Sequence, residues 1–219
     1  MRKFIYLISP NNIHKNFYKE LDLVLSANNV KFFQLRLKKH KTDKVIKIAK
    51  KIKKITSKHN VKLIINDSIK IANAVMADGC HLGQKDISNL TKNSKNIKSK
   101  NVKNEKIRSY FTKNKQKKLI GITCHNSKNL ANIALKNKVD YIAFGSFNNS
   151  KLKPKAKKAN LNILRWAKKN VKKPVVAIGG IDNLNYKKLI NLGANYIAIS
   201  SYIWDNPKLK PEIAIKKFK

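Results

Sequence analysis

Short apolar runs rich in β-branched and aromatic residues recur along the chain, and a longer lysine-studded segment with helical spacing follows most of them. Continuous apolar runs are typical of strands buried on both faces of a parallel sheet, and their alternation with helices predicts βαβ units. The eight runs are FIYLI at 4–8, VKFFQLR at 30–36, VKLIIN at 61–66, GCHL at 79–82, LIGIT at 119–123, YIAFG at 141–145, PVVAIGG at 174–180 and YIAIS at 196–200.

Eight strands that each pair with a helix predict an α/β fold, a closed (β/α)8 TIM barrel, built as a single domain over residues 1–219. The chain is short for this fold, which typically takes ~250 residues. An open doubly wound sheet is the alternative. It is disfavoured because the chain has no GxGxxG motif after its first strand and no GxxxxGKS/T motif anywhere.

The segments between the runs carry helical signals. Leu21 and Val24 are spaced as on one helix face, and the pairs at 126–127 (Asn-Ser) and 182–183 (Asp-Asn) stand where helix N-caps would lie. Residues 88–118 break the rhythm, because they are dominated by Lys, Asn and Ser. We expect a Lys/Asn-rich insertion there that forms a mobile connection, with a lid over substrate as the alternative.

The location of the protein is predicted from what the chain lacks. The apolar run at 4–8 is too short for the core of a signal peptide, and no stretch approaches the roughly 20 apolar residues that span a bilayer. Cys80 and Cys124 have no CxxC spacing, which argues against both a metal site and a disulfide framework. We therefore expect a cytoplasmic protein without a membrane partner, and its oligomeric state stays open, a homo-oligomer included.

The formal net charge is +39, because lysine and arginine outnumber aspartate and glutamate by 50 to 11. Nucleic-acid-binding proteins usually gather such charge on one face and mix arginine with stacking aromatic residues. Here nearly all basic residues are lysines, spread along every predicted helix together with abundant Asn and Ile. This spread favours a compositional bias. Attraction of anionic small substrates is the second interpretation and nucleic-acid binding the third.

Polar residues at the end of the second run point to a cationic site. In a TIM barrel the active site is built at the carboxyl ends of the strands. Gln34, Arg36 and Lys38 alternate there, so they share a face directed into or above the barrel. Charges in such a place need a ligand or a partner, and an internal arginine paired with a carboxylate is the alternative for Arg36.

Two of the 11 acidic residues follow neighbouring runs. Asp67 comes directly after Asn66 at the end of the third run, and Asp86 follows the fourth. Mg²⁺ is usually held by one or two carboxylates, with waters and substrate phosphates completing the octahedron. We expect a Mg²⁺ site there, and the alternative for Asp67 is an N-cap of a helix that begins at Ser68.

The later runs end in hydroxyl groups, a lysine and glycines. Loops after the last two strands of such barrels commonly bind a phosphate through backbone N–H groups. The sequence therefore predicts two anion sites, a cationic and metal-assisted one on the middle strands and a neutral backbone one on the last two. The residues concerned are Thr123, Ser150, Lys153, Gly180, Ser200 and Ser201.

The run IINDSIKIANAVMADGCHLGQKD at 64–86 resembles the long signature of the thiamine phosphate synthase family almost position by position. Shorter matches stand in the family's order and cover nearly the whole chain except the Lys-rich insertion. They are YLIS at 6–9, FFQLRLK at 32–38, IGITCHNS at 120–127, DYIAFGSF at 140–147, SKLK at 150–153, VVAIGGI at 175–181 and GANYIAISSYI at 193–203.

The resemblance implies two small-molecule substrates and Mg²⁺. A 4-amino-5-hydroxymethyl-2-methylpyrimidine diphosphate loses pyrophosphate to give a pyrimidine-methyl cation, which the nitrogen of 4-methyl-5-(2-phosphoethyl)thiazole captures. In the matched positions, Asp67 and Asp86 are the metal ligands and Gln34 lies near the pyrimidine. Arg36, Lys38, Asn66, Thr123 and Lys153 surround the departing pyrophosphate, and Gly180, Ser200 and Ser201 hold the thiazole phosphate.

The chain departs from the family after the sixth run, where GPxxPTxTK is replaced by GSFNNSKLK. Ser146 and Asn149 stand in place of two prolines, which predicts a less rigid loop. Ser150 keeps a hydroxyl and is expected to bind substrate, whereas Leu152 loses the hydroxyl of a threonine. This loss puts one contact to the thiazole phosphate in question.

Dissociative loss of pyrophosphate needs fixed positive charge and little covalent chemistry from the protein. We accordingly interpret Cys124 and His125 as packing and loop residues rather than as a nucleophile and its base. A thiazole tautomerase is the nearest alternative, but it has no need for the metal and pyrophosphate set. A basic nucleic-acid-binding protein on a degenerate barrel is the alternative from another class.

Overall fold

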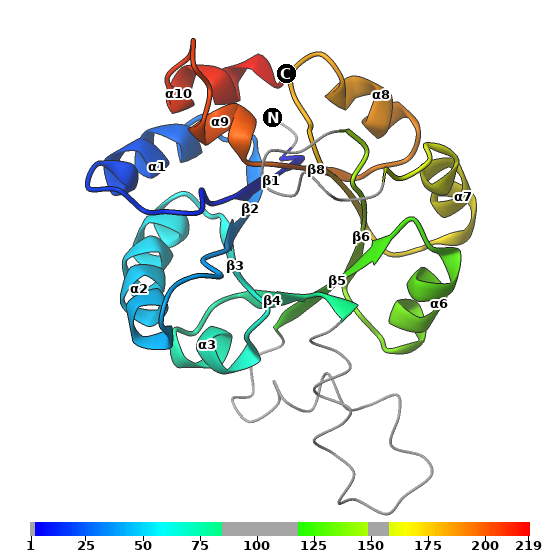
Figure 1. Cartoon of the computed structure of the whole chain (residues 1–219), viewed down its shortest axis with the longest axis horizontal. Coiled ribbons are helices and arrows are strands. Elements are labelled where there is room, and N and C mark those ends of the chain that lie inside the picture. Colours follow the sequence, from blue (N-terminus) through cyan, green and yellow to red (C-terminus); the bar gives the residue numbers. More distant parts are fainter. Residues whose placement is uncertain (1–2, 85–117, 149–157) are drawn as a thin grey trace, which may run out of the picture.

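The computed structural model describes residues 3–84, 118–148 and 158–219. Within them, eight parallel strands pair in sequence order and β8 closes onto β1 (Figure 1). The predicted TIM barrel is confirmed, and each strand begins within one residue of its predicted start. The strands are β1 (Ile5–Ile8), β2 (Val30–Leu35), β3 (Lys62–Asn66), β4 (Gly79–Leu82), β5 (Leu119–His125), β6 (Tyr141–Gly145), β7 (Val175–Ile178) and β8 (Tyr196–Ile199).

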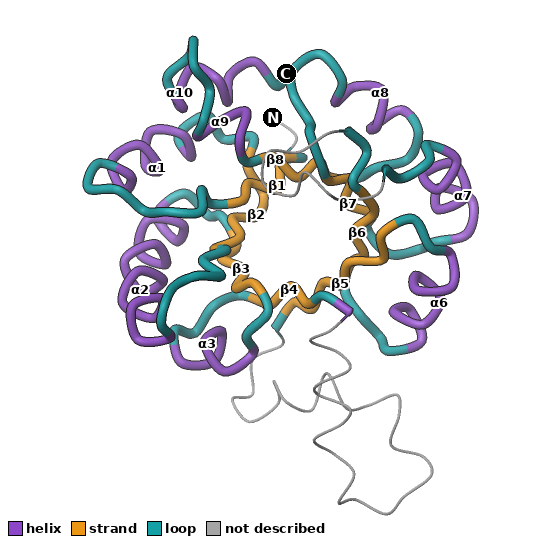
Figure 2. Tube along the Cα trace, viewed as in Figure 1, coloured by secondary structure: helices purple, strands orange, loops and turns teal. Residues whose placement is uncertain are grey.

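The helices form an outer ring around the strands (Figure 2). They are α1 (Phe17–Leu25), α2 (Thr42–Lys58), α3 (Ile69–Ala74), α6 (Lys128–Lys136), α7 (Asn162–Asn170), α8 (Tyr186–Asn191), α9 (Ser201–Trp204), α10 (Pro211–Ala214) and the 3-10 turn η2 (Ile215–Lys217). None of the described helices is both long enough and apolar enough to cross a membrane.

Helix α2 shows how the ring accommodates so many lysines. Val45, Ile48 and Ile52 recur at helical spacing and are buried, whereas Lys44 and Lys47 are exposed. This pattern is that of an amphipathic helix whose apolar stripe covers the outside of a sheet. The lysines of this helix therefore lie mainly on its outer face, opposite the apolar stripe.

The core has two layers. Most buried side chains pack between the strands and the helical ring, and a smaller cluster fills the inside of the barrel. The interior cluster comes from alternate strand positions, because successive side chains of a strand point to opposite faces. It consists of Tyr6, Ile8, Phe32, Ile64, Tyr141, Ala143, Val176 and Ala198.

Gly121 makes room for the ring of Tyr141 inside the barrel. A Cβ at this position would lie 1.9 Å from Cζ of Tyr141, so only glycine lets the Tyr141 ring cross to its neighbours. The ring stacks on Phe32, with centroids 5.9 Å apart. Gly121 and Tyr141 are also register partners in the β5 and β6 pair.

The amino ends of the strands are clamped by a repeated contact. A side-chain oxygen of Asp78, just before β4, accepts the N–H of Leu63 at 2.9 Å. Asp140 accepts the N–H of Ile120 at 2.8 Å before β6, and Asn195 accepts that of Val175 at 2.8 Å before β8. Each clamp ties one strand to the strand before it. The pattern satisfies backbone groups that the barrel ladder leaves unpaired.

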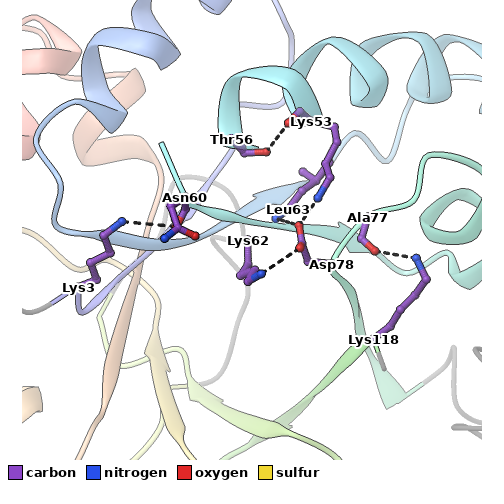
Figure 3. Close-up of polar contacts among 9 residues, drawn as sticks. All are labelled: Lys3, Lys53, Thr56, Asn60, Lys62, Leu63, Ala77, Asp78 and Lys118. Carbon is purple, nitrogen blue, oxygen red and sulfur yellow. Dashed lines mark hydrogen bonds and ion pairs between the residues drawn. The ribbon is translucent and has the colours of Figure 1, made fainter. Parts of the chain in front are cut away.

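The clamp at Asp78 is surrounded by lysines (Figure 3). Lys53 and Lys62 place their Nζ atoms 2.6 and 3.4 Å from its carboxylate oxygens. Asp78 is half-buried, and these lysines with the Leu63 N–H outweigh burial, so the pKa of the carboxyl falls below its usual value. Lys53, Lys62 and Asp78 line a cavity of about 590 Å³ at this end of the barrel.

Lys118, the last residue of the Lys/Asn-rich segment predicted to be a mobile connection, is the one residue of that segment that the structure describes. Its side chain is buried beside Asp78, and its Nζ donates to the carbonyl of Ala77 at 2.7 Å. Burial lowers the pKa of its ammonium group. Residues 88–117 lie outside the described residues, so the mobile connection and the single-domain boundary stay predictions.

The predicted helix starts have different outcomes. Ser127 is the N-cap of α6 and accepts the N–H of Leu130, as expected. Helix α8 begins later than predicted, because Asp182 accepts the N–H groups of Leu184 and Asn185 in a turn before the helix. This local turn competes with the helical ladder, as short Asx side chains often do.

Candidate active site

Gln34 and Asn66 meet inside the barrel at its carboxyl end. Gln34 lies on β2 and Asn66 ends β3, the neighbouring strand. Nε2 of Gln34 donates to Oδ1 of Asn66 at 2.8 Å, and Gln34 is buried. Gln34 therefore faces Asn66 at this end of the barrel, whereas β2 ends at Leu35 and Arg36 lies just beyond the strand.

Arg36 is fixed through its backbone N–H, and its guanidinium is left largely able to bind a ligand. Its N–H donates to Oγ of Ser9 at 3.0 Å, and Nη1 makes a long contact of 3.4 Å to Oδ1 of Asn11. In the part of the chain that the structure describes, the guanidinium forms no salt bridge. Burial lowers its pKa, and the field of Asp67 opposes this shift. Among residues 3–84, 118–148 and 158–219, no carboxylate forms the salt bridge to Arg36 that the alternative requires.

Asp67 pairs with the third residue of the predicted cationic set. Nζ of Lys38 lies 2.9 Å from Oδ2 of Asp67, and both side chains are partly exposed. The backbone of Asp67 has φ of 62°, and its N–H donates to the carbonyl of His81 at 2.8 Å. Ser68 is the N-cap of α3 and accepts the N–H of Ile71, so the N-cap interpretation of Asp67 is wrong.

Thr123 stands in a buried hydrogen-bond network on the floor of this end. Nε2 of His81 lies 2.8 Å from Oγ1 of Thr123, and Nδ1 lies 3.1 Å from the hydroxyl of Tyr141. That hydroxyl lies 2.8 Å from the hydroxyl of Tyr6. Nε2 of Gln84 donates to the carbonyl of Thr123 at 2.6 Å. Thr123 is thus fixed through both its backbone and its side chain.

The chain that follows β6 packs onto the end of β7. The N–H groups of Phe147 and Asn148 donate to the carbonyls of Ile178 and Gly179. Gly179 is required for this contact, because a Cβ there would lie 1.9 Å from Oγ of Ser146. Ser146, which replaces a proline of the family pattern, is anchored by donating to the carbonyl of Asn148 at 2.6 Å. This described part of the loop is fixed without the proline.

The last two strands supply backbone at the same end. Gly180 follows β7 with φ of 58°, and its carbonyl accepts Nδ2 of Asn185 at 3.0 Å. Ser200 is buried, and its hydroxyl donates to the carbonyl of Ser9 at 3.1 Å, so this hydroxyl joins β8 to β1. Ser201 opens the short helix α9.

A sequence profile of the family described as thiamine monophosphate synthase matches residues 5–203. The chain belongs to this family. A thiamine-phosphate synthase of Pelagibacter ubique is 49% identical over 219 residues, which is 100% of this chain and 97% of the relative. A thiamine-phosphate synthase of Clostridium acetobutylicum is 32% identical, covering 96% of this chain and 92% of the relative. The relatives are transferases, and the chain is an enzyme of this class.

The fold of the thiamine monophosphate synthase family is also found in solved structures. The thiamine phosphate pyrophosphorylase of Pyrococcus furiosus superposes with a TM-score of 0.76 at 24% identity, covering 99% of this chain and 93% of that one. At this identity the likeness shows the fold alone. It agrees with the closed eight-stranded barrel.

The structure brings together one part of the predicted site. Gln34, Arg36, Lys38, Asn66, Asp67 and Thr123 gather over β2, β3 and β5. Asp86, Ser150 and Lys153 lie outside the described residues, as do Asn149 and Leu152 of the altered loop. Among the residues that are described, no group of three or more His, Cys, Asp or Glu could by itself hold a metal ion.

Cys124 is a packing residue, as predicted, whereas His125 is the last residue of β5 and pairs with Phe144 of β6 instead of lying in a loop. Cys124 is buried, and burial raises the pKa of its thiol to about 12, which keeps it protonated and unreactive. His125 is exposed with φ of 52°.

Sequence reasoning missed the residues that hydrogen-bond to the predicted site residues and hold them in place. Ser9 and Asn11 hold Arg36, and His81 with Tyr141 holds Thr123. Strand parity could have found His81, because it is two positions beyond Gly79 in a run whose alternate residues point inward. No such signal marks Asn11, which lies in the loop after β1.

Proposed function

We propose that the chain couples 4-amino-5-hydroxymethyl-2-methylpyrimidine diphosphate with 4-methyl-5-(2-phosphoethyl)thiazole to give thiamine phosphate and pyrophosphate. The observation that carries this proposal is Arg36, a half-buried guanidinium at the carboxyl end of the barrel without a salt bridge among the described residues. A buried charge left in this way needs an anion to stabilise it. The diphosphate of the first substrate supplies that anion.

The residues of the site suit departure of a charged leaving group. As the bond between the pyrimidine methylene and the diphosphate oxygen breaks, negative charge grows on the diphosphate and positive charge on the methylene. Arg36 and Lys38 stabilise the former by fixed positive charge, in a place where water is partly excluded. The thiazole nitrogen then forms the new bond to the methylene carbon. No nucleophilic residue of the protein is required.

Neutral polar residues orient the substrates. Gln34 and Asn66 present amide groups on the inner face, where Gln34 reads the pyrimidine and Asn66 contacts the diphosphate. Thr123 offers its hydroxyl to the same diphosphate. Gly180, Ser200 and Ser201 receive the thiazole phosphate through backbone groups at the end of β7 and β8, because the Ser200 hydroxyl is engaged with Ser9.

Asp67 fits a Mg²⁺ ligand in its chemistry. Its carboxylate is partly exposed at the strand end, with Oδ2 paired to the partly exposed ammonium of Lys38. One or two carboxylates with waters and substrate phosphates are the usual magnesium ligands, and Asp86 would be the second carboxylate. When bound, Mg²⁺ supplies neutralisation of the diphosphate charge. Ser150 and Lys153 complete the proposed set, and the reaction would take place in the cytoplasm.

A coupling assay tests the proposed function directly. The purified chain is mixed with both substrates and Mg²⁺, and thiamine phosphate is followed as its fluorescent oxidation product, with EDTA as a parallel arm. Asp67→Ala is expected to lower kcat/KM at least about a hundredfold, or roughly 2.7 kcal/mol of transition-state stabilisation. The matched control is Asp205→Ala, which removes an exposed carboxylate after α9 and is expected to leave the rate unchanged.

The outcomes separate the candidate functions. Metal-dependent product that falls in Asp67→Ala but not in Asp205→Ala supports the synthase reaction. No product from folded protein contradicts it, and proton exchange on the thiazole substrate without coupling would assign the chain to tautomerase chemistry instead.

A further inference from the structure

A chain of hydrogen bonds crosses the inside of the barrel below the proposed site. It starts at the hydroxyl of Tyr6 on β1 and passes to the hydroxyl of Tyr141 on β6 at 2.8 Å. It continues to Nδ1 of His81 on β4 at 3.1 Å and leaves Nε2 of the same ring for Oγ1 of Thr123 at 2.8 Å. The Tyr141 and His81 rings are stacked, with centroids 5.6 Å apart. Four strands thus contribute to one chain.

The two phenols in this chain are neutral. Tyr6 and Tyr141 are almost completely buried inside the barrel. Burial raises the pKa of both hydroxyls well above the ordinary value of tyrosine. Each phenol therefore has one proton to donate, and the direction of donation along the chain becomes a matter of counting protons.

The count favours one direction. If Tyr141 donated to Tyr6, the Tyr6 proton would have no acceptor among the described residues, since its one hydrogen-bond partner there is Tyr141. Burying a donor without an acceptor costs its desolvation free energy. If Tyr6 donates to Tyr141 and Tyr141 donates to His81, just a lone pair of Tyr6 stays unused. This second arrangement is the less costly of the two.

The direction fixes the tautomer of His81. An Nδ1 that accepts the Tyr141 proton belongs to the neutral ring with its proton on Nε2. Nε2–H then donates to Oγ1 of Thr123. Since that oxygen is occupied as an acceptor, the Thr123 proton is free to be donated into the partly exposed end of the barrel, where the proposed diphosphate would lie.

We propose that Tyr141 and His81 are positioning residues that make the Thr123 hydroxyl a proton donor toward an anionic oxygen. The reversed chain would turn the Thr123 proton inward and present lone pairs to the anion, which would repel it. The proposal rests on the proposed function in one respect, because the anion is taken to be the departing diphosphate. The direction of donation along the hydrogen-bond chain does not depend on that function.

The tautomer is measured by ¹⁵N NMR on the full chain with labelled histidine imidazoles and no substrate. The chain has five histidines, and the His81 signals are identified by their loss in His81→Gln. We expect the wild-type His81 ring to show a protonated Nε2 and an unprotonated Nδ1. A protonated Nδ1 would overturn the proposal. Because the tautomer is measured on the wild type, this result does not depend on whether the tyrosine variants fold.

Variants then test what the direction does. Tyr141→Phe removes the donor to His81, so the pure Nε2–H signal is expected to give way to a mixture, and kcat of coupling to fall about tenfold. Tyr6→Phe removes a proton that only Tyr141 receives, so the Nε2–H signal is expected to persist. Tyr18→Phe, on the outer helix α1, is the activity control and is expected to leave kcat unchanged.

The failures are distinguishable. A persistent Nε2–H signal with unchanged kcat in Tyr141→Phe would contradict a positioning role for Tyr141. Absence of coupling in the wild type would overturn the proposed function. A measured Nε2–H tautomer of His81 would still establish the direction of donation along the hydrogen-bond chain.

Discussion

The two ends of the barrel hold charged residues in opposite ways. At the amino ends of the strands, Asp78 receives Lys53, Lys62 and the N–H of Leu63, so its carboxylate is fully paired. At the carboxyl ends, Arg36 is partly buried, and among the described residues its guanidinium makes one long contact, to Asn11. The charges at the amino end are paired without a ligand, whereas the positive charge at the carboxyl end would be paired by an anionic ligand.

This difference indicates which charged residues stabilise the fold and which are left to bind a ligand. A paired carboxylate that also accepts a backbone N–H stabilises the folded state, because removing it leaves partners unsatisfied. A half-buried cation without a salt bridge costs stability in the absence of an anion. Substitutions at the two ends should therefore affect different properties.

The largest effect is expected at the carboxyl end. Arg36→Met removes the charge while keeping much of the side-chain volume, and we expect kcat/KM of coupling to fall about a hundredfold or more, since one preorganised electrostatic group contributes this much. The free energy of unfolding in urea should stay the same or rise. Arg165→Met on α7 is the control, because its guanidinium is exposed on the outer ring. A loss of stability without loss of rate would break the comparison.

The amino end should show the reverse. Asp78→Ala leaves the Leu63 N–H and Lys53 without their acceptor, and we expect the free energy of unfolding to fall by about 2–3 kcal/mol. The rate per folded molecule should change little. Asp22→Ala is the control for removing a carboxylate, because its pair with Lys58 is exposed and its pair with His59 is only partly buried, so the loss should be less than about 1 kcal/mol. Equal losses in both variants would contradict a special role for Asp78.

A smaller effect is expected when acid removes the charge of Asp78. The pKa of this carboxyl is lowered in the folded state, so it contributes stability above its unfolded pKa of about 3.9 and loses it as pH falls through the folded value. Asp78→Asn keeps an acceptor for Leu63 but not the charge. The wild type should therefore exceed this variant by about 1 kcal/mol near neutral pH, and the difference should shrink below about pH 4 in urea titrations. A difference that grows on acidification would reverse the expected sign.

Strand order, strand starts and the helical ring follow from the sequence, because apolar runs and helical spacing report burial directly. The buried face of α2 is an example, with Val45, Ile48 and Ile52 in register. Lys118 was not predicted to be buried, because composition alone described it. Its burial depends on Asp78 and Ala77, which are about 40 positions earlier in the chain and are brought near by the pairing of β4 with β5.

The candidate site was predicted in part for a similar reason. Gln34, Asn66 and Thr123 were found because strand ends gather at one end of a barrel. The support of Arg36 by Ser9 and Asn11 depends on where the loop after β1 lies, and local sequence does not encode this position. The direction of the chain through His81 needed the distances between four strands.

Binding of pyrophosphate with Mg²⁺, followed by calorimetry at a salt concentration that screens the outer lysines, tests the contrast between the two ends most directly. We predict a site in the wild type that weakens at least about tenfold in Arg36→Met, or roughly 1.4 kcal/mol, and is unchanged in Asp78→Ala. Equal affinity in wild type and Arg36→Met, or loss of binding in folded Asp78→Ala, would contradict the assignment of ligand binding to the carboxyl end.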